Sequence, residues 1–342
     1  MFATVALLSL TTPQADIRPV VAPHCSPAEV QALTGPADVA APAVRLTCFA
    51  TLPPGRSIQR RILFEGAEAS GAGIDCNGGS VGRPGEPSTT RHPTIAVWSR
   101  RDSGGWSVPR DVRVARCTIH GNLRVWGLGR DDLDSLRASS RTPGHTAAVQ
   151  ASAPTGLRLD DVTFVASGSI PLYVGPGVTD VRMSGGGFRG RSVSSAVYLD
   201  AESARAVIRG VAFDIRTARE KIAIDGSANN RIEANSFNLG GRGGVFLYRN
   251  CGEDGVVRHQ TPSGNTITGN RFEGAAWFRP RPVVVGSREG RRRYCDDDAG
   301  WSFGSSADDG DRATANVVSG NTVRLRWLPS WLQAGRGPVK AP

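Results

Sequence analysis

Lysine is almost absent from this sequence. Only Lys221 and Lys340 are lysine among 41 basic residues, so the formal net charge of +10 comes almost wholly from arginine. A surface of this kind favours acidic partners. The arginines are scattered, tyrosine occurs only four times, and no nucleic-acid-binding motif appears apart from an arginine run at 291–293. We therefore do not expect nucleic acid as the partner.

Long hydrophobic runs are also absent, which argues against a membrane-spanning protein. No segment reaches the roughly 18 apolar residues that a transmembrane helix needs. Residues 1–15 hold a short apolar run followed by small and polar residues, and they predict a signal peptide cleaved near Ala15. We expect a secreted or periplasmic monomer without membrane insertion. An ordinary N-terminal strand is the alternative for this segment.

The cysteines lack the C-x-x-C spacing that is typical of a zinc cluster. They number six, and in an exported chain an even number predicts up to three disulfides. Buried thiols in a cytosolic protein are the alternative. We expect neighbours to pair in order, because the first two bracket an N-terminal cap and the last two bracket an insertion. The pairs would be Cys25 with Cys48, Cys76 with Cys117, and Cys251 with Cys295.

Long amphipathic helices are scarce as well. The chain holds 42 glycines and 22 prolines in 342 residues, which favours many turns. Short helices are predicted at Ser26 to Leu33, with Ser26 as the N-cap, and at Asp131 to Ala138. Most of the remaining regular structure should be short strands.

A repeat runs through the middle and the end of the sequence. Short apolar segments end in phenylalanines that are 24, 25, 24 and 35 residues apart, namely Phe164, Phe188, Phe213, Phe237 and Phe272. A second apolar column runs through Leu159, Met183, Ile208, Ile232, Ile267 and Val318, and a third column through Asn235, Asn270 and Asn321. Repeats of this length, made of strands, predict a parallel β-helix in which each coil packs on its neighbours. The leucine-rich-repeat consensus is missing.

The segments GNTITGNRF, ANVVSGNTV and GIDCNGGSVG resemble the right-handed parallel β-helix, pectate-lyase-like superfamily of secreted polysaccharide-active proteins. The resemblance implies an all-β, single-domain right-handed solenoid with a small N-terminal cap and loop insertions. We expect a signal peptide at 1–15, a cap at 16–59, the β-helix at 60–326 and a tail at 327–342. Lyases, hydrolases, epimerases and non-catalytic proteins share this fold, so the resemblance does not fix the activity.

Alignment of the first strand in each coil predicts a polar patch. It puts Val149, Leu172, Leu199, Ile224 and Leu247 in one inward column. An outward column runs through Gln150, Tyr173, Asp200, Asp225 and Tyr248. Because adjacent coils lie about 4.8 Å apart, we expect one solvent-facing patch made of Tyr198, Asp200, Lys221, Asp225, Tyr248 and Arg249. Two stacked aspartates need a cation between them, and Lys221 or a Ca²⁺ on Asp200 and Asp225 could supply it.

A loop after this patch adds further candidates. Arg249 and Asn250 end a strand, Cys251 can fix the loop, and Arg258 and His259 lie where the loop returns to the coil. Arginine recognises carboxylates with two parallel hydrogen bonds, and histidine exchanges protons near neutral pH. We expect Asn250 and Arg258 to bind substrate.

Charge and compartment together indicate an acidic polysaccharide as the substrate. The leading hypothesis is a lyase that cleaves beside a uronic acid by β-elimination. Arg249, with Arg258 or a Ca²⁺, would neutralise the sugar carboxylate, Lys221 would be the base, and Tyr248, Tyr198 or His259 would donate a proton. Neighbouring carboxylates would raise the pKa of Lys221, which disfavours it as a base.

Three alternatives stay open at this point. A glycoside hydrolase would use Asp200 and Asp225 as its carboxyl pair. An epimerase would abstract the same C5 proton as the lyase. A non-catalytic polysaccharide-binding or surface protein would need neither, and its Asp200, Lys221 and Asp225 would simply neutralise one another.

Overall fold

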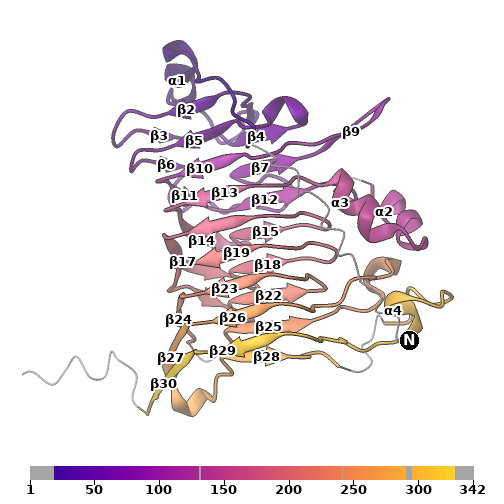
Figure 1. Cartoon of the computed structure of the whole chain (residues 1–342). Helices are drawn as coiled ribbons and strands as arrows, with labels where there is room; N and C mark the ends of the chain where they lie inside the picture. Colours follow the sequence, from indigo (N-terminus) through magenta and orange to yellow (C-terminus); the bar gives the residue numbers. More distant parts are fainter. Residues whose placement is uncertain (1–18, 131, 241, 290–294, 328–342) are drawn as a thin grey trace, which may run out of the picture.

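The computed structural model describes residues 19–130, 132–240, 242–289 and 295–327. The predicted signal peptide at 1–15, the arginine run at 291–293 and nearly all of the tail at 327–342 lie outside the described residues. Three long sheets of parallel strands wrap around one apolar core (Figure 1). The chain is therefore an all-β, single-domain parallel β-helix, as predicted.

Each coil contributes one strand to each sheet, in chain order. Sheet 1 consists of β1 (Val44–Arg45), β4 (Ile62–Glu65), β7 (Ile95–Trp98), β12 (Leu123–Trp126), β15 (Leu172–Val174), β18 (Val197–Leu199), β22 (Ile222–Asp225), β25 (Val245–Tyr248) and β28 (Val283–Val285). Sheet 2 consists of β2 (Phe49–Thr51), β5 (Gly73–Asp75), β10 (Arg113–Ala115), β13 (Arg158–Asp160), β16 (Arg182–Ser184), β19 (Val207–Arg209), β23 (Arg231–Glu233), β26 (Thr266–Thr268) and β29 (Val317–Ser319).

Sheet 3 completes the coil. It consists of β3 (Ser57–Ile58), β6 (Ser80–Val81), β11 (Thr118–His120), β14 (Thr163–Gly168), β17 (Gly187–Ser192), β20 (Ala212–Phe213), β24 (Ser236–Asn238), β27 (Arg271–Ala275) and β30 (Thr322–Arg326), and β21 (Arg216–Thr217) pairs with β17. The first coil already begins at β1, inside the range 16–59 that the sequence assigned to the cap, because β1, β2 and β3 pair with the strands of the next coil.

The predicted columns are present as stacked ladders. The phenylalanine rings of neighbouring coils lie 5.0, 4.9, 4.5 and 4.7 Å apart between centroids. In the asparagine column, Asn270 Oδ1 accepts hydrogen bonds from Asn235 N and Nδ2 at 2.9 and 3.0 Å. A second asparagine ladder, which the sequence reading missed, runs through Asn230, Asn265 and Asn316. These ladders satisfy backbone groups at the turns that close each coil.

One part of the predicted register is wrong. Leu199 pairs with Val174 rather than with Leu172. In the strand pairing, Tyr173 is therefore opposite Tyr198 and not opposite Asp200, although its hydroxyl still reaches the Asp200 carboxylate. Val149 is not in a strand, because it belongs to a helix of the insertion after β12. A two-residue shift leaves every side chain on the same face of its strand, so hydrophobic alternation cannot detect it.

Insertions leave the coil on one side, always after a strand of sheet 1 (Figure 1). They contain the hairpin β8 (Arg100–Asp102) and β9 (Gly105–Ser107), the helices α2 (Leu133–Ser140) and α3 (His145–Ser152), the short η2 (Glu253–Gly255), and α4 (Gly304–Ala307). Two further 3-10 turns, η1 (Ala67–Ala69) and η3 (Ala276–Phe278), lie elsewhere in the coils. Helix α2 begins later than predicted because Asp132 caps it.

The N-terminal helix and the disulfides agree with the sequence. Helix α1 (Pro27–Leu33) starts at the N-cap Ser26, which forms a capping box with Glu29. Disulfides join Cys25 to Cys48, Cys76 to Cys117 and Cys251 to Cys295, the pairing of neighbours that was expected. No helix among the described residues is both long and apolar enough to cross a membrane.

Candidate functional site

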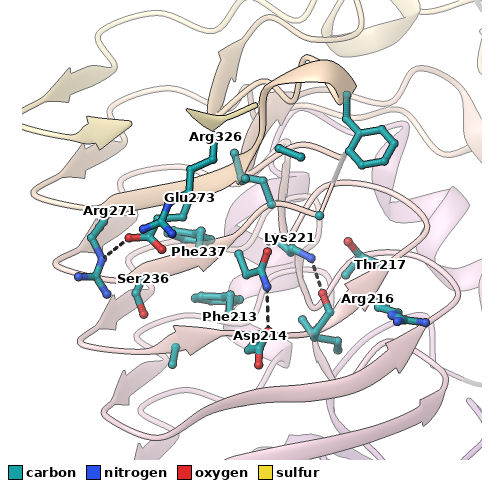
Figure 2. Close-up of a pocket in the computed structure, with 18 of the residues that line it drawn as sticks. Phe213, Asp214, Arg216, Thr217, Lys221, Ser236, Phe237, Arg271, Glu273 and Arg326 are labelled. Atoms are coloured by element: carbon teal, nitrogen blue, oxygen red, sulfur yellow. Dashed lines mark hydrogen bonds and ion pairs between the residues drawn. The ribbon is translucent and has the colours of Figure 1, made fainter. Parts of the chain in front are cut away.

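A groove of about 1000 Å³ opens on sheet 3 (Figure 2). It lies where the central strands β20 and β24 are short, while β17 and β27 extend further on either side. The residues that follow the short strands, including Asp214 and Leu239, line the hollow. The groove therefore results from unequal strand lengths in neighbouring coils, and it runs across several coils.

Lys221 lies in this groove rather than in the predicted patch. It precedes β22, at the corner where the chain passes from sheet 3 to sheet 1, and its Nζ donates a hydrogen bond to Ile215 O (Figure 2). The side chain is 2% exposed. The expectation that Lys221 faces solvent beside Asp200 and Asp225 is therefore wrong, because the corner turns its side chain towards sheet 3.

Burial gives Lys221 an unusual protonation equilibrium. Loss of solvent around the ammonium lowers the pKa of Lys221 from 10.5 to about 8, and the nearby Asp214 carboxylate opposes this shift. The sequence reading had expected carboxylates to raise the pKa of this lysine. In the structure desolvation outweighs the one carboxylate that acts on it. A sizeable neutral fraction at mildly alkaline pH is what a general base requires.

Arginine and aromatic side chains also line the groove. Arg216 and Arg271 line the groove, and Arg271 also lies 3.5 Å from a Glu273 carboxylate oxygen. Trp277 and Phe278, on η3, are 51% and 58% exposed. Cations beside exposed aromatic faces can hold an acidic sugar, because the cations bind its carboxylate and the rings pack against its apolar face.

The groove was not predicted, although the sequence held a signal for three of the residues that line it, Asp214, Asn238 and Glu273. The residue after each stacked phenylalanine points out of sheet 3, and in the later coils this column is polar. It runs through Arg189, Asp214, Asn238, Glu273 and Arg324. Asn238 Nδ2 donates to Asp214 Oδ1 at 3.0 Å within it (Figure 2).

The other predicted residues gather on sheet 1, under the insertions. Tyr198 OH donates to Asp225 Oδ2 at 2.5 Å, and Tyr173 OH donates to Asp200 Oδ2. Asn250 donates to both oxygens of Asp225, from its backbone N and its Nδ2, each at 2.7 Å. Burial raises the pKa of Asp225. It also raises the pKa of both tyrosines well above the usual value.

Arg258 supplies the cation that the two aspartates need. Its Nη1 lies 3.3 Å from Asp200 Oδ1. Burial works against the charged form of this guanidinium, but Asp200 and Asp225 together keep the pKa of Arg258 above its ordinary value. Arg258 thus takes the place that the sequence reading gave to Lys221 or Ca²⁺. Ca²⁺ at Asp200 and Asp225, the alternative to Lys221 in the sequence analysis, stays a hypothesis.

Tyr248 is buried in the same region. Its hydroxyl donates to Glu220 Oε1 at 3.1 Å and accepts from Arg219 Nη2 at 2.7 Å. The guanidinium carbon of Arg288 lies 3.6 Å from the centre of its ring. Burial raises the pKa of Tyr248 well above the usual value. Tyr248 therefore belongs to a packed polar network and does not face the groove.

Arg249 and His259 hold the insertions in place. The Arg249 guanidinium donates to Gly310 O at 2.7 Å and lies 2.9 Å from Asp308 Oδ1. It therefore does not face Asp200 and Asp225. His259 Nε2 lies 2.7 Å from Ser140 O, and the centre of the His259 ring lies 5.0 Å from that of the His145 ring. Neither residue lines the groove.

No family model and no curated protein matches this chain. Among solved structures it is similar to PfbA, a surface adhesin of Streptococcus pneumoniae, at 13% identity and a TM-score of 0.42 over 66% of this chain and 55% of that one. It thus spans about half the length of that adhesin chain. It is also similar to an alginate lyase from a Paenibacillus species (13% identity, TM-score 0.39, 84% of this chain and 92% of that one) and to DFA-IIIase from Arthrobacter chlorophenolicus (15%, 0.33, 87% and 93%). At these identities the likeness concerns the fold alone.

Proposed function

We propose that the protein is an exported polysaccharide lyase that cleaves a uronate-containing chain in the sheet 3 groove, with Lys221 as the base. The observation that carries the proposal is a buried lysine of lowered pKa, in a groove that also presents arginines and exposed aromatic rings. The disulfides fit an oxidising compartment outside the cytosol.

The reaction would use few groups. Arg216 or Arg271 pairs with the sugar carboxylate and so acidifies the C5 proton. Lys221 is 2% exposed, so its side chain must first turn away from Ile215 O into the groove. Its neutral Nζ then takes that proton, the electron pair of the C–H bond forms the C4–C5 double bond, and the C4–O4 bond breaks. The ammonium formed on Lys221 returns its proton to the leaving O4. The products are a new reducing end and an unsaturated uronate.

The expected proton donors Tyr198, Tyr248 and His259 have no role in this scheme, because they lie under the insertions on sheet 1. One lysine acts as base and then as acid, which suits elimination in which both groups leave from the same side of the sugar. Trp277 and Phe278 would pack against the sugar rings on either side of the bond that breaks.

The test is ultraviolet absorbance of the unsaturated product, with Ca²⁺ and with a chelator. The substrate is alginate, whose mannuronate units carry H5 and O4 on the same side of the ring, and polygalacturonate, in which they lie on opposite sides, is the comparison. We expect activity in the wild type and in Lys340→Met, which changes the other lysine of the sequence, and none in Lys221→Met. Activity that survives Lys221→Met would keep the lyase but remove its base. A loss on adding chelator would show that the reaction needs Ca²⁺.

A second candidate function is hydrolysis by the Asp200 and Asp225 pair. The observation that favours it is that burial raises the pKa of Asp225, which lies near a second carboxyl group, that of Asp200. A carboxyl group of raised pKa can serve as the general acid of a hydrolase. Asp225 is fully buried, so this reaction needs the insertions to open. New reducing ends without ultraviolet absorbance, lost in Asp200→Asn, would identify hydrolysis. A changed uronate composition with no new ends would identify an epimerase, and binding alone a non-catalytic protein.

A further inference from the structure

Three exposed arginines border the groove on its β17 side. Arg189 and Arg191 flank Gly190, which lines the groove, and Arg191 pairs in register with Arg216 on β21. We call Arg189, Arg191 and Arg216 the arginine rim. All three are exposed.

The arginine rim carries positive charge on two columns of sheet 3: Arg189 neighbours Asp214, whereas Arg191 neighbours another arginine, Arg216. Arg191 and Arg216 lie on paired parallel strands about 4.8 Å apart, and like charges in directly opposed positions destabilise a sheet. Within the described part of the chain, none of the three makes an ion pair or a side-chain hydrogen bond. On sheet 2, by contrast, arginines lie beside carboxylates: Arg113 is 2.8 Å from Asp160, and Arg231 is 2.7 Å from Glu233.

Paired arginines that repel one another gain stability when an anion lies between them. Guanidinium groups bind carboxylates with two parallel hydrogen bonds, and this geometry suits a uronate better than a simple inorganic ion. The rim continues the line of the groove along sheet 3, across the neighbouring coil. A polymer that enters the groove therefore meets these side chains with its next sugar units.

We propose that the arginine rim, through Arg189 and Arg191, binds the carboxylates of uronate units that extend beyond the Lys221 groove, so that the protein prefers long acidic chains to short oligomers. This inference rests on the proposed function for the position of the polymer in the groove. Its chemistry requires only a chain of carboxylated sugars, and it holds for binding without cleavage as well.

The test compares two double variants. Arg189→Gln with Arg191→Gln removes two rim charges and leaves Arg216 in the groove. Arg182→Gln with Arg209→Gln is the matched control, because both arginines are exposed on sheet 2 and make no ion pair within the described residues. Each protein is measured for equilibrium binding of polygalacturonate and alginate, for binding of a trisaccharide of each, and for KM and kcat wherever cleavage occurs.

We expect the rim variant to bind the polymer about tenfold more weakly, with an unchanged affinity for the trisaccharide and a shallower dependence on salt. Where cleavage occurs, KM for the polymer should rise while kcat stays constant. The control should match the wild type. Circular dichroism of the exposed-residue variants verifies folding.

The outcomes separate this inference from the lyase proposal. Tenfold weaker polymer binding without any unsaturated product would support the rim and reject the lyase. Unsaturated product with the same KM and salt dependence in the rim variant would support the lyase and overturn the rim. An equal loss in the sheet 2 control would also overturn it, because general positive charge would explain the binding. A wild type that binds neither polymer overturns it outright.

Discussion

Lys221 and Asp225 are four residues apart, and their side chains serve opposite sides of the solenoid corner. Lys221 donates to Ile215 O in the groove, while Asp225 accepts from Asn250 and Tyr198 beneath the insertions. Strict alternation would put both side chains on one face. Lys221 precedes β22 and lies in the turn, where alternation does not apply. The separation frees the lysine from both aspartates and leaves desolvation as the main influence on its pKa.

The first prediction concerns stability and Lys221→Met. The folded pKa is lowered to about 8, so the unfolded chain binds a proton that the native one lacks between about pH 8 and 10.5. Lys221 should therefore contribute a rise in stability with pH across this window, and the difference in stability between the wild type and the variant should shrink by that amount. At pH 7 the variant should be more stable by about 2 kcal/mol, since the relief of a shift worth about 3 kcal/mol is offset by the lost hydrogen bond.

Urea unfolding of both proteins at pH 7 and at pH 10.5 measures this difference. Lys340→Met serves as the matched control and should follow the wild type. Parallel stability curves for the wild type and Lys221→Met would contradict a buried lysine of lowered pKa.

The second prediction concerns Asp214, whose charge raises the pKa of Lys221. Asp214→Asn removes that charge and keeps an oxygen that can accept from Asn238. The pKa of Lys221 should fall further, by on the order of half a unit. If Lys221 is the base, the alkaline rise in kcat/KM should move to lower pH by the same amount.

An amine-reactive reagent labels only the neutral form of Lys221. The labelling rate, measured by mass spectrometry of the Lys221 peptide over a pH series, therefore reports this pKa without any need for enzyme activity. Glu273→Gln, which changes another groove carboxylate that does not act on the pKa of Lys221, is the control. A labelling curve that stays in place in Asp214→Asn would rule out the proposed influence.

The third prediction concerns the buried ion network. Arg258→Met leaves Asp200 and Asp225 without their shared cation, and removing one partner of a buried ion pair costs roughly 3–5 kcal/mol. The cost should shrink at acid pH, because burial raises the pKa of Asp225 to about 7, and a protonated Asp225 needs no cationic partner. Urea unfolding at pH 5 and pH 8 tests this. Arg205→Met, which removes an exposed ion pair with Asp180, should cost about 1 kcal/mol or less.

The fourth prediction concerns the asparagine ladder. Asn270→Ala removes an oxygen that accepts from Asn235 N and Nδ2 and an amide that donates to Ile232 O and Asn321 Oδ1. Because the position is fully buried, the groups left behind gain no water. The loss in unfolding free energy should be about 2–4 kcal/mol. Asn238→Ala, on the exposed side of β24, should cost much less, and equal losses would show that the ladder has no special weight.

The repeating parts of this protein could be predicted from its amino-acid sequence. The phenylalanine, aliphatic and asparagine columns predicted the β-helix, because each coil can bury its apolar side only against neighbours that carry the same residue at the same place. Neighbouring cysteines predicted the disulfides for a similar reason, since segments close along the chain stay close in stacked coils. The sequence also predicted that Tyr198, Asp200 and Asp225 lie in one patch, with Asn250 and Arg258 on the loop that follows it.

The strand register at Tyr173, the direction of the Lys221 side chain and the groove could not be predicted from the sequence. A shift of two residues keeps every side chain on its face, so the register of Tyr173 was invisible to the pattern. The direction of Lys221 depends on the corner between two sheets, and the groove depends on where β20 and β24 stop relative to β17 and β27. Whether a lysine is buried, and hence where its pKa lies, follows from packing between coils that no single segment encodes.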